Sequence, residues 1–161
     1  MGRYDLRDFL KIKNIECVAL CDVDDSRVGE TVKRVLDPAS VAAPGLTTRD
    51  FRKVLELKEL EATIVATPDH WHALPTIAAC HAGKDVYVEK PLSVSIAEGR
   101  AMVENARKHE RVVQMGTQQR SAPHYTAGSR IREEREARAR TTGSGLGLSR
   151  RERRDTGQTR W

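Results

Sequence analysis

The stretch over residues 62–92, with the sequence ATIVATPDHWHALPTIAACHAGKDVYVEKPL, constrains the fold most strongly. It opens with a short β-branched run and continues, after Thr67-Pro68, with small and apolar residues at helical spacing over 71–82. Gly83 follows at the position typical of a helix C-cap, and a second β-branched and aromatic run covers 85–88. A strand, a helix and a strand within about thirty residues form a βαβ unit, which predicts a parallel sheet.

Polar residues follow each of the two predicted strands. The first cluster is TPDHWH, at residues 67–72, and the second is Glu89-Lys90, just before Pro91. Ligands of parallel α/β sheets bind beyond the carboxyl ends of the strands. We therefore expect binding or catalytic residues in both clusters.

The rest of the chain alternates in the same way. The pattern predicts helices and strands in this order: a helix over 3–12, a strand over 15–21, a helix from Asp24 or Asp25 to Leu36, a loop over 37–46, a helix over 50–59 capped by Thr47 or Thr48, a helix opened by Ser93 or Ser95, and a strand over 111–115. Regular alternation of strands and helices is typical of a doubly wound α/β fold. A length of 161 residues allows one such domain.

Charge divides the chain near Tyr125. Residues 1–125 contain 18 Lys and Arg and 18 Asp and Glu, whereas residues 126–161 contain 10 Arg and 5 acidic residues, so the net charge of +5 comes from the tail. The tail also has few apolar residues, which predicts disorder over 126–161 after a folded domain at 1–125. One alternative function is therefore a non-catalytic fragment whose Arg-rich tail binds nucleic acid weakly through phosphates, although the neutral domain favours no such partner.

The three cysteines predict neither a disulfide nor a metal site. Cys17 and Cys21 lie roughly 13 Å apart if they share a strand, beyond disulfide reach, and Cys80 lies on a predicted helix. We expect buried, reduced thiols and a cytoplasmic protein, with an export signal upstream of Met1 left open. No apolar stretch approaches the roughly 20 residues of a membrane span, so a membrane partner is not expected.

Asp22 lies 20 residues after Gly2, with a predicted helix and strand between them. This is the spacing at which dinucleotide-binding domains place the acidic residue that accepts hydrogen bonds from the adenosine ribose. A cap for the helix that follows is the alternative role. A carboxylate at the ribose repels a 2′-phosphate, so the pattern favours NAD over NADP.

Four motifs occur in order: VALCDVD, ATPDHWH, YVEKPLS and QMGTQQRSAPHY. Together they resemble the nucleotide-binding half of the Gfo/Idh/MocA oxidoreductases over residues 2–125. The resemblance implies a Rossmann-like fold, NAD, and a small sugar or cyclitol-like substrate that is oxidised at a secondary alcohol; it leaves homo-oligomerisation open. It implies a catalytic role for Lys90, beside the substrate hydroxyl. The cofactor-binding residues it implies are Gly2, Asp22, Thr67, Pro68, His70, Trp71, His72, Glu89, Lys90, Gln118 and Arg120.

Two departures from the family pattern matter. The family begins with a strand and a G-x-x-G-x-G turn, of which only Gly2 has a counterpart, so we expect a sheet that is incomplete at its N-terminal strand. Nothing after Tyr125 resembles the family's C-terminal substrate domain, and we expect the chain to be inactive by itself. Asp69, His70 and His72 could suggest a metal site, but local hydrogen bonding is the more common role of such a pattern, and no metal is predicted. A Schiff-base lysine at Lys90 is a further alternative.

Overall fold

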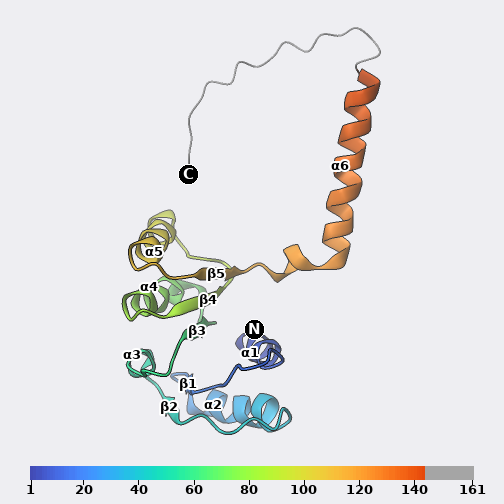
Figure 1. The fold of residues 1–161 in the computed structure, drawn as a ribbon. Coiled ribbons are helices and arrows are strands. Elements are labelled where there is room, and N and C mark those ends of the chain that lie inside the picture. The colour runs from blue at the N-terminus through green and yellow to red at the C-terminus, as the bar shows by residue number, and fades with distance from the viewer. Residues whose placement is uncertain (144–161) are drawn as a thin grey trace. The chain divides into compact units, whose positions relative to one another are not determined.

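The computed structural model describes residues 1–143, without the side chains of residues 124, 126 and 137–143 (Figure 1). The chain divides into two compact units, Met1–Thr117 and a second that begins at Gln118. Each unit is described by itself.

The first unit alternates strands and helices as predicted. Its elements are α1 (Gly2–Phe9), β1 (Ala19–Cys21), α2 (Asp25–Thr31), the π-helical turn η1 (Val32–Leu36), β2 (Leu46–Thr48), α3 (Phe51–Leu55), β3 (Ala62–Val65), the 3-10 turn η2 (Asp69–Trp71), α4 (Ala73–His81), β4 (Asp85–Glu89), α5 (Ile96–Lys108) and β5 (Val113–Gly116). Strand β2 was not predicted. Leu46, Thr47 and Thr48 instead pair with β1, and Asp50 caps α3 by accepting a hydrogen bond from the Arg52 amide at 3.0 Å.

All strand pairs are parallel. One sheet contains β1 and β2 and the other contains β3, β4 and β5, with β4 in the middle. In the part of the chain that the structure describes, no hydrogen-bonded pair joins β1 to β3, so the parallel arrangement is interrupted between them. The predicted Rossmann-like α/β fold with parallel strands is confirmed.

Strand β4 separates two layers of side chains. Val86 and Val88 are 3% and 0% exposed and belong to the core, whose other members come from β3, α4 and α5: Val65, Ala73, Ala79, Cys80 and Met102. Because successive residues of a strand point to opposite faces, Tyr87 faces the other way. There its ring packs edge-on against Phe9 of α1, with 5.2 Å between the centroids. Helices therefore cover both faces of this sheet.

The cysteines only partly match the expectation of buried thiols. All three are free, and Cys80 is fully buried in the core. Cys17 is half-buried, whereas Cys21 is exposed at the end of the short strand β1. The prediction of burial is therefore wrong for Cys21, because the strand that carries it has a neighbour on one edge only among the described residues.

The second unit contains the 3-10 turn η3 (Gln118–Ser121) and the helix α6 (Pro123–Gly143). Disorder was predicted from residue 126, but the structure has a helix over 126–143. The Arg/Glu composition that argues against a packed face also supplies helix-stabilising pairs one turn apart, such as Arg132 with Glu136 at 3.0 Å. The rest of that prediction, over 144–161, lies outside the described residues, and the domain boundary at residue 125 stays a prediction.

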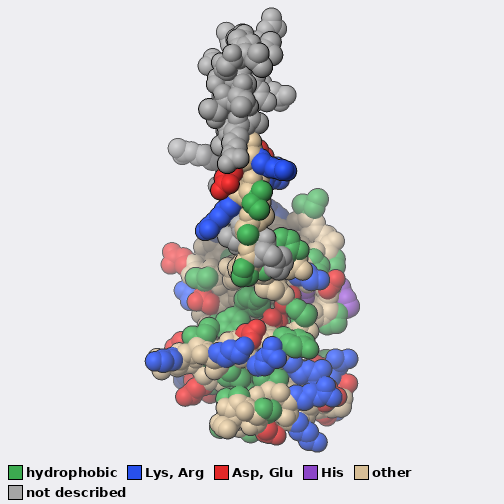
Figure 2. Space-filling model, turned by 90° about the vertical axis from the view of Figure 1, so that its right-hand side faces the viewer, with side chains coloured by type: hydrophobic (Ala, Val, Ile, Leu, Met, Phe, Trp, Pro, Cys, Tyr) green, Lys and Arg blue, Asp and Glu red, His purple; other side chains and the backbone are tan. Residues whose placement is uncertain are grey.

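Neither unit contains, within residues 1–143, a helix that is both long and apolar enough to cross a bilayer. On the face shown in Figure 2, basic and acidic side chains are intermixed over the compact part of the molecule. This mixed surface agrees with the equal numbers of basic and acidic residues in 1–125.

We predict that Met102→Ala lowers the free energy of unfolding by about 2–5 kcal/mol, because the Met102 side chain is 1% exposed and its removal leaves a cavity under α5. Ile96 lies on the same helix but is 93% exposed, so Ile96→Ala should change stability by less than about 0.5 kcal/mol. Urea denaturation of both variants measures the difference. Equal effects would contradict the assignment of the core.

Candidate functional site

Apart from Gly2, which begins α1, the candidate residues of the first unit lie at or just beyond the carboxyl ends of its strands. The register pairs Val65 of β3 with Val88 of β4, so Thr67 and Lys90 each lie two residues past paired positions. Parallel pairing thus brings the two polar clusters to the same edge of the sheet. Asp22 occupies the equivalent position after β1.

Asp22 does not cap the following helix. Its amide donates to the carbonyl of Thr48 at 3.2 Å, and its Oδ1 accepts a hydrogen bond from the Asp24 amide at 3.0 Å. Asp24 is the residue that caps α2, by accepting from the Ser26 amide at 2.9 Å. The alternative role considered for Asp22 is therefore wrong, and its half-buried carboxylate lies at the strand end, where the ribose role stays a prediction.

Gly2 lies where a larger residue would collide with Ala66, the residue that follows β3. A Cβ atom at this position would approach the Cβ of Ala66 to 2.8 Å, closer than carbon atoms pack. The first turn of α1 therefore lies directly against the chain that leaves β3. The first amides of a helix lack intrahelical partners and attract anions, so this turn can accept a phosphate group.

The loop after β3 divides into exposed and buried residues. Thr67, Pro68, His70 and Trp71 lie on the surface, with Trp71 44% exposed. His72, by contrast, is 1% exposed. The sequence grouped all five as lining of one groove, but the structure places His72 beneath the loop, where it packs at the start of α4.

His72 connects the ends of two strands. Its Nδ1 lies 2.5 Å from the carbonyl oxygen of Pro91, and its Nε2 lies 2.9 Å from the carbonyl oxygen of Thr67. Both partners only accept hydrogen bonds, so a neutral imidazole with its single N–H can satisfy one of them and a doubly protonated ring both. The side chain thereby fixes the loop after β3 to the turn after β4.

Glu89 and Lys90 have contrasting environments. The Glu89 side chain is 3% exposed, and its Oε2 accepts a hydrogen bond from the Lys90 amide at 3.0 Å. The Lys90 side chain is exposed, and its peptide bond to Pro91 is cis. The buried carboxylate therefore fixes the backbone of the turn and leaves the ammonium group at the surface, where a ligand can reach it.

Three residues around Glu89 were not found from the sequence. A Cβ atom at Gly116 of β5 would lie 2.9 Å from the Tyr87 hydroxyl and 3.3 Å from the Glu89 carboxyl carbon, so a side chain at this position would displace Tyr87 or Glu89. On the other side lies Asp5 of α1. Burial, followed by the charge of Glu89 and a hydrogen bond to it, raises the pKa of Asp5 to about 6. Burial, and then the charges of Asp5 and Glu89, also raise the pKa of Tyr87.

Tyr87 could have been found from the sequence, because the alternation in Tyr-Val-Glu places it on the same face as Glu89. No pattern marks Asp5, since an acidic residue in the first turn of a helix is common for electrostatic reasons alone.

Gln118 and Arg120 are exposed on η3, in the second unit. They are therefore not among the residues that the first unit brings together, and their role stays a prediction. Within the described part of the chain, no group of three or more His, Cys, Asp or Glu residues has the arrangement of a metal site.

Parallel strands connected by helices, with polar residues at the carboxyl ends of the strands, are typical of dinucleotide-binding domains of the Rossmann type. The model of the oxidoreductase family with an NAD-binding Rossmann fold matches residues 1–117. The chain belongs to this family, as the resemblance of its four motifs to the Gfo/Idh/MocA oxidoreductases predicted. A nicotinamide cofactor follows from this membership.

Known proteins agree with this assignment. Inositol 2-dehydrogenase of Salmonella typhimurium is 30% identical over 115 residues, which are 71% of this chain and 32% of the relative. Glycosyl hydrolase family 109 protein 1 of Shewanella sp. (strain MR-4) is 24% identical over 112 residues, 68% of this chain and 24% of the relative. The chain thus spans about a quarter to a third of the length of these relatives.

Solved structures show the same fold. Scyllo-inositol dehydrogenase from Lactobacillus casei, with bound NAD(H) and scyllo-inositol, has a TM-score of 0.69 at 19% identity. Myo-inositol 2-dehydrogenase from Lactobacillus plantarum has a TM-score of 0.67 at 24% identity. Each match covers 83% of this chain and 38% of the solved one.

We predict that His72→Leu lowers the free energy of unfolding by about 2–4 kcal/mol, because the carbonyls of Thr67 and Pro91 lose their buried partner. His70→Leu, in the same loop but exposed, is the matched control and should change stability by less than about 0.5 kcal/mol. Chemical denaturation measures both. A neutral effect of His72→Leu would mean that water or another group satisfies the carbonyls equally well.

Proposed function

We propose that this chain is the NAD-binding domain of an oxidoreductase that removes hydride from a secondary alcohol of a cyclitol or sugar-like small molecule. The observation that carries the proposal is the meeting of three features at one end of the strands in a domain of this family: the anion-accepting turn at Gly2, the carboxylate of Asp22, and the exposed ammonium group of Lys90. They provide contacts for the pyrophosphate, the adenosine ribose and the reacting alcohol.

The residues present fit this cofactor. A Cβ atom at Gly2 would clash with Ala66, so the helix start packs closely against the chain after β3, which is the packing role of the last glycine in the dinucleotide fingerprint. Asp22 accepts one amide hydrogen bond through Oδ1, and a carboxylate has further acceptor capacity for ribose hydroxyls. Its negative charge disfavours a 2′-phosphate, so we propose NAD in preference to NADP.

Lys90 is the proposed catalytic residue. Its ammonium group would donate a hydrogen bond to the alcohol oxygen and stabilise the negative charge that develops there while a separate general base takes the proton. The buried Glu89, bonded to the Lys90 amide, and His72, bonded to the Pro91 carbonyl, hold the turn that carries it. The nicotinamide, when bound, supplies the hydride acceptor.

The substrate class rests on the relatives. Three of the compared proteins are named for inositol, and the structure of one of them contains scyllo-inositol. Another relative is named a glycosyl hydrolase, and its match covers a similar share of this chain, 68% against 71%. The matched domain is therefore compatible with more than one reaction on polyhydroxylated rings, and we propose a cyclitol as the first substrate to test. The three free thiols favour a reducing, cytoplasmic location.

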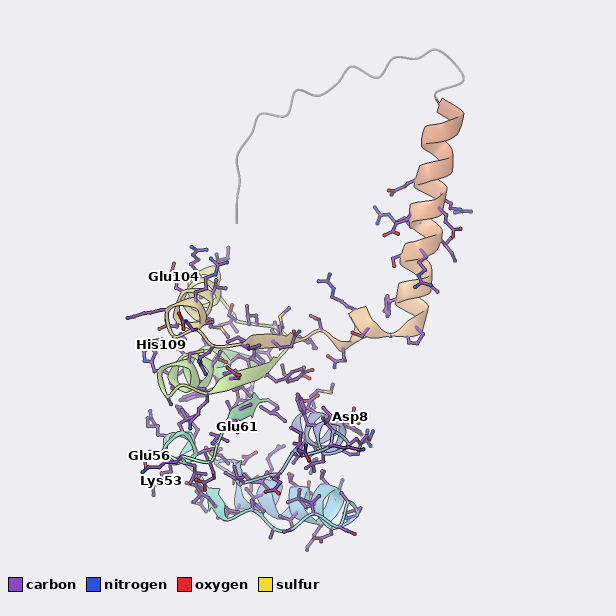
Figure 3. All side chains as sticks on the ribbon, viewed as in Figure 1. Asp8, Lys53, Glu56, Glu61, Glu104 and His109 are labelled. Atoms are coloured by element: carbon purple, nitrogen blue, oxygen red, sulfur yellow. The ribbon has the colours of Figure 1, made fainter. Side chains whose placement is uncertain are left out.

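We predict that Asp22→Ala lowers affinity for NAD at least about tenfold and reduces the preference for NAD over NADP, because the ribose hydroxyls lose their acceptor and the 2′-phosphate loses its repulsion. Calorimetric titration with both dinucleotides measures this. Glu56→Gln, which changes the same charge at the end of α3 (labelled in Figure 3), should leave both affinities unchanged. Equal affinities for NAD and NADP in the unaltered chain would refute the role of Asp22.

We predict that Lys90→Met reduces turnover about a hundredfold or more in a form of the protein that oxidises a cyclitol, while NAD affinity changes less than about threefold. The reason is that Lys90 acts on the alcohol oxygen and not on the adenosine end of the cofactor. NADH absorbance with scyllo- or myo-inositol gives turnover, and calorimetry gives affinity. An unchanged turnover number would remove Lys90 from the mechanism.

A further inference from the structure

Helix α1 contacts strand β4 through two pairs of side chains, Asp5 with Glu89 and Phe9 with Tyr87. Asp5 and Phe9 are one helical turn apart, a rise of about 6 Å, and Tyr87 and Glu89 are two strand residues apart, about 7 Å. The spacings match, and the order of the pairs shows that the helix runs antiparallel to the strand. The polar pair lies at the end that carries Gly2 and Lys90.

The polar pair is built from two acids. Asp5 Oδ2 and Glu89 Oε1 are both buried, and neither has an N–H or O–H donor among the described residues. Ionised carboxylates only accept hydrogen bonds, so the bond between the two groups requires a proton on one of them. With one proton present, each buried oxygen finds its partner in the other carboxyl group; without it, two like charges face each other inside the protein.

We propose that Asp5 is a positioning residue that shares one proton with Glu89, and that this proton-dependent bond holds the first turn of α1 against the strand ends beside Lys90. The relevance to catalysis rests on the proposed function, whereas the shared proton does not. Loss of the proton would loosen the turn that begins at Gly2 and thus weaken dinucleotide binding as the pH rises.

The charged groups around the pair are few. The amine of Met1 favours the ionised form of Asp5, while Glu89 and Asp8 disfavour it. From β4, the phenol of Tyr87 also faces the pair. Strand β3, which packs against α1, has no titratable residue, and the two charged residues of η1, Lys33 and Arg34, are exposed.

The direction of the pH dependence follows from these groups. Folding raises the pKa of Asp5 from 3.8 to about 6, so between these values the folded chain binds more protons than the unfolded one. The stabilisation by the shared proton is complete below pH 3.8 and is lost as the pH rises through about 6. Docking of α1 should therefore weaken from pH 5 to pH 8.

Carbon-13 NMR of the side-chain carboxyls in the 161-residue chain tests the pair. We expect Asp5 to titrate with a midpoint near 6, well above Asp8 on the outer side of the same helix (labelled in Figure 3), whose pKa is lowered by its bond to Lys11. Amide-exchange protection of α1, corrected for the intrinsic pH dependence, should fall about tenfold or more from pH 5 to pH 8.

Asp5→Asn is the informative variant, because an amide donates to the Glu89 carboxylate without a shared proton. In this variant the amide-exchange protection of α1 should no longer depend on pH. The affinity of the variant chain for NAD should likewise be independent of pH between 5 and 8. Asp8→Asn is the matched control and should retain the pH dependence of the unaltered chain.

A midpoint for Asp5 near that of Asp8 would overturn the proposal, as would undiminished pH dependence of α1 protection in Asp5→Asn. If that variant does not fold, the titration of the unaltered chain decides alone. The test also separates this inference from the proposed function. If Asp5 titrates near 6 but the chain does not bind NAD, the shared proton is retained and the proposed function is refuted. If the chain binds NAD but Asp5 titrates near 4, the proposed function is retained and the shared proton is refuted.

Discussion

The parallel pairing of β4 with a neighbour on each edge is the interaction on which the first unit depends. These hydrogen bonds bring β3, β4 and β5 into one register and align their carboxyl ends. The alternation of side chains along β4 then supplies two layers at once, with Val86 and Val88 in the core under α4 and α5 and Tyr87 toward α1. A change in register by one residue would exchange these layers, so the same constraint determines both packing and site.

The polar candidate residues gather where the paired strands end. Parallel strands finish at a common edge, and the chain leaves each of them through a polar turn. His72 and Glu89 use buried hydrogen bonds to fix two of these turns, which lets Lys90 remain exposed without being mobile at its backbone. Burying a polar group is costly unless it is hydrogen-bonded, so His72 and Glu89 each have a structural role at the strand ends.

Strands β1 and β3 are not paired in the described part of the chain, so contacts other than strand pairing must hold the two sheets of the first unit together. Helix α1 packs on β3 of one sheet and on η1, the turn that continues α2 after β1. The close approach of Gly2 to Ala66 and the Asp5–Glu89 pair belong to this helix. The position of α1 therefore affects both the arrangement of the sheets and the edge where a dinucleotide would bind.

The sequence by itself determined the alternation of strands and helices, the parallel sheet, the family and the positions of Asp22, Thr67 and Lys90 after strands. Local patterns suffice for these features, because hydrophobic periodicity and turn residues act over a few neighbours. Short elements were harder: β2 is only three residues long, and its threonines were equally compatible with a helix cap. The helix over 126–143 likewise depends on weak pairs along a polar segment.

Only the tertiary structure decided which candidates are buried and what they contact. His70 and His72 are alike in sequence, yet one is exposed and the other bridges two carbonyls. Asp5 acquires its raised pKa because folding buries it and brings it to Glu89, 84 residues away in the chain. Burial and long-range charge depend on which elements pack together, and no local pattern contains that information.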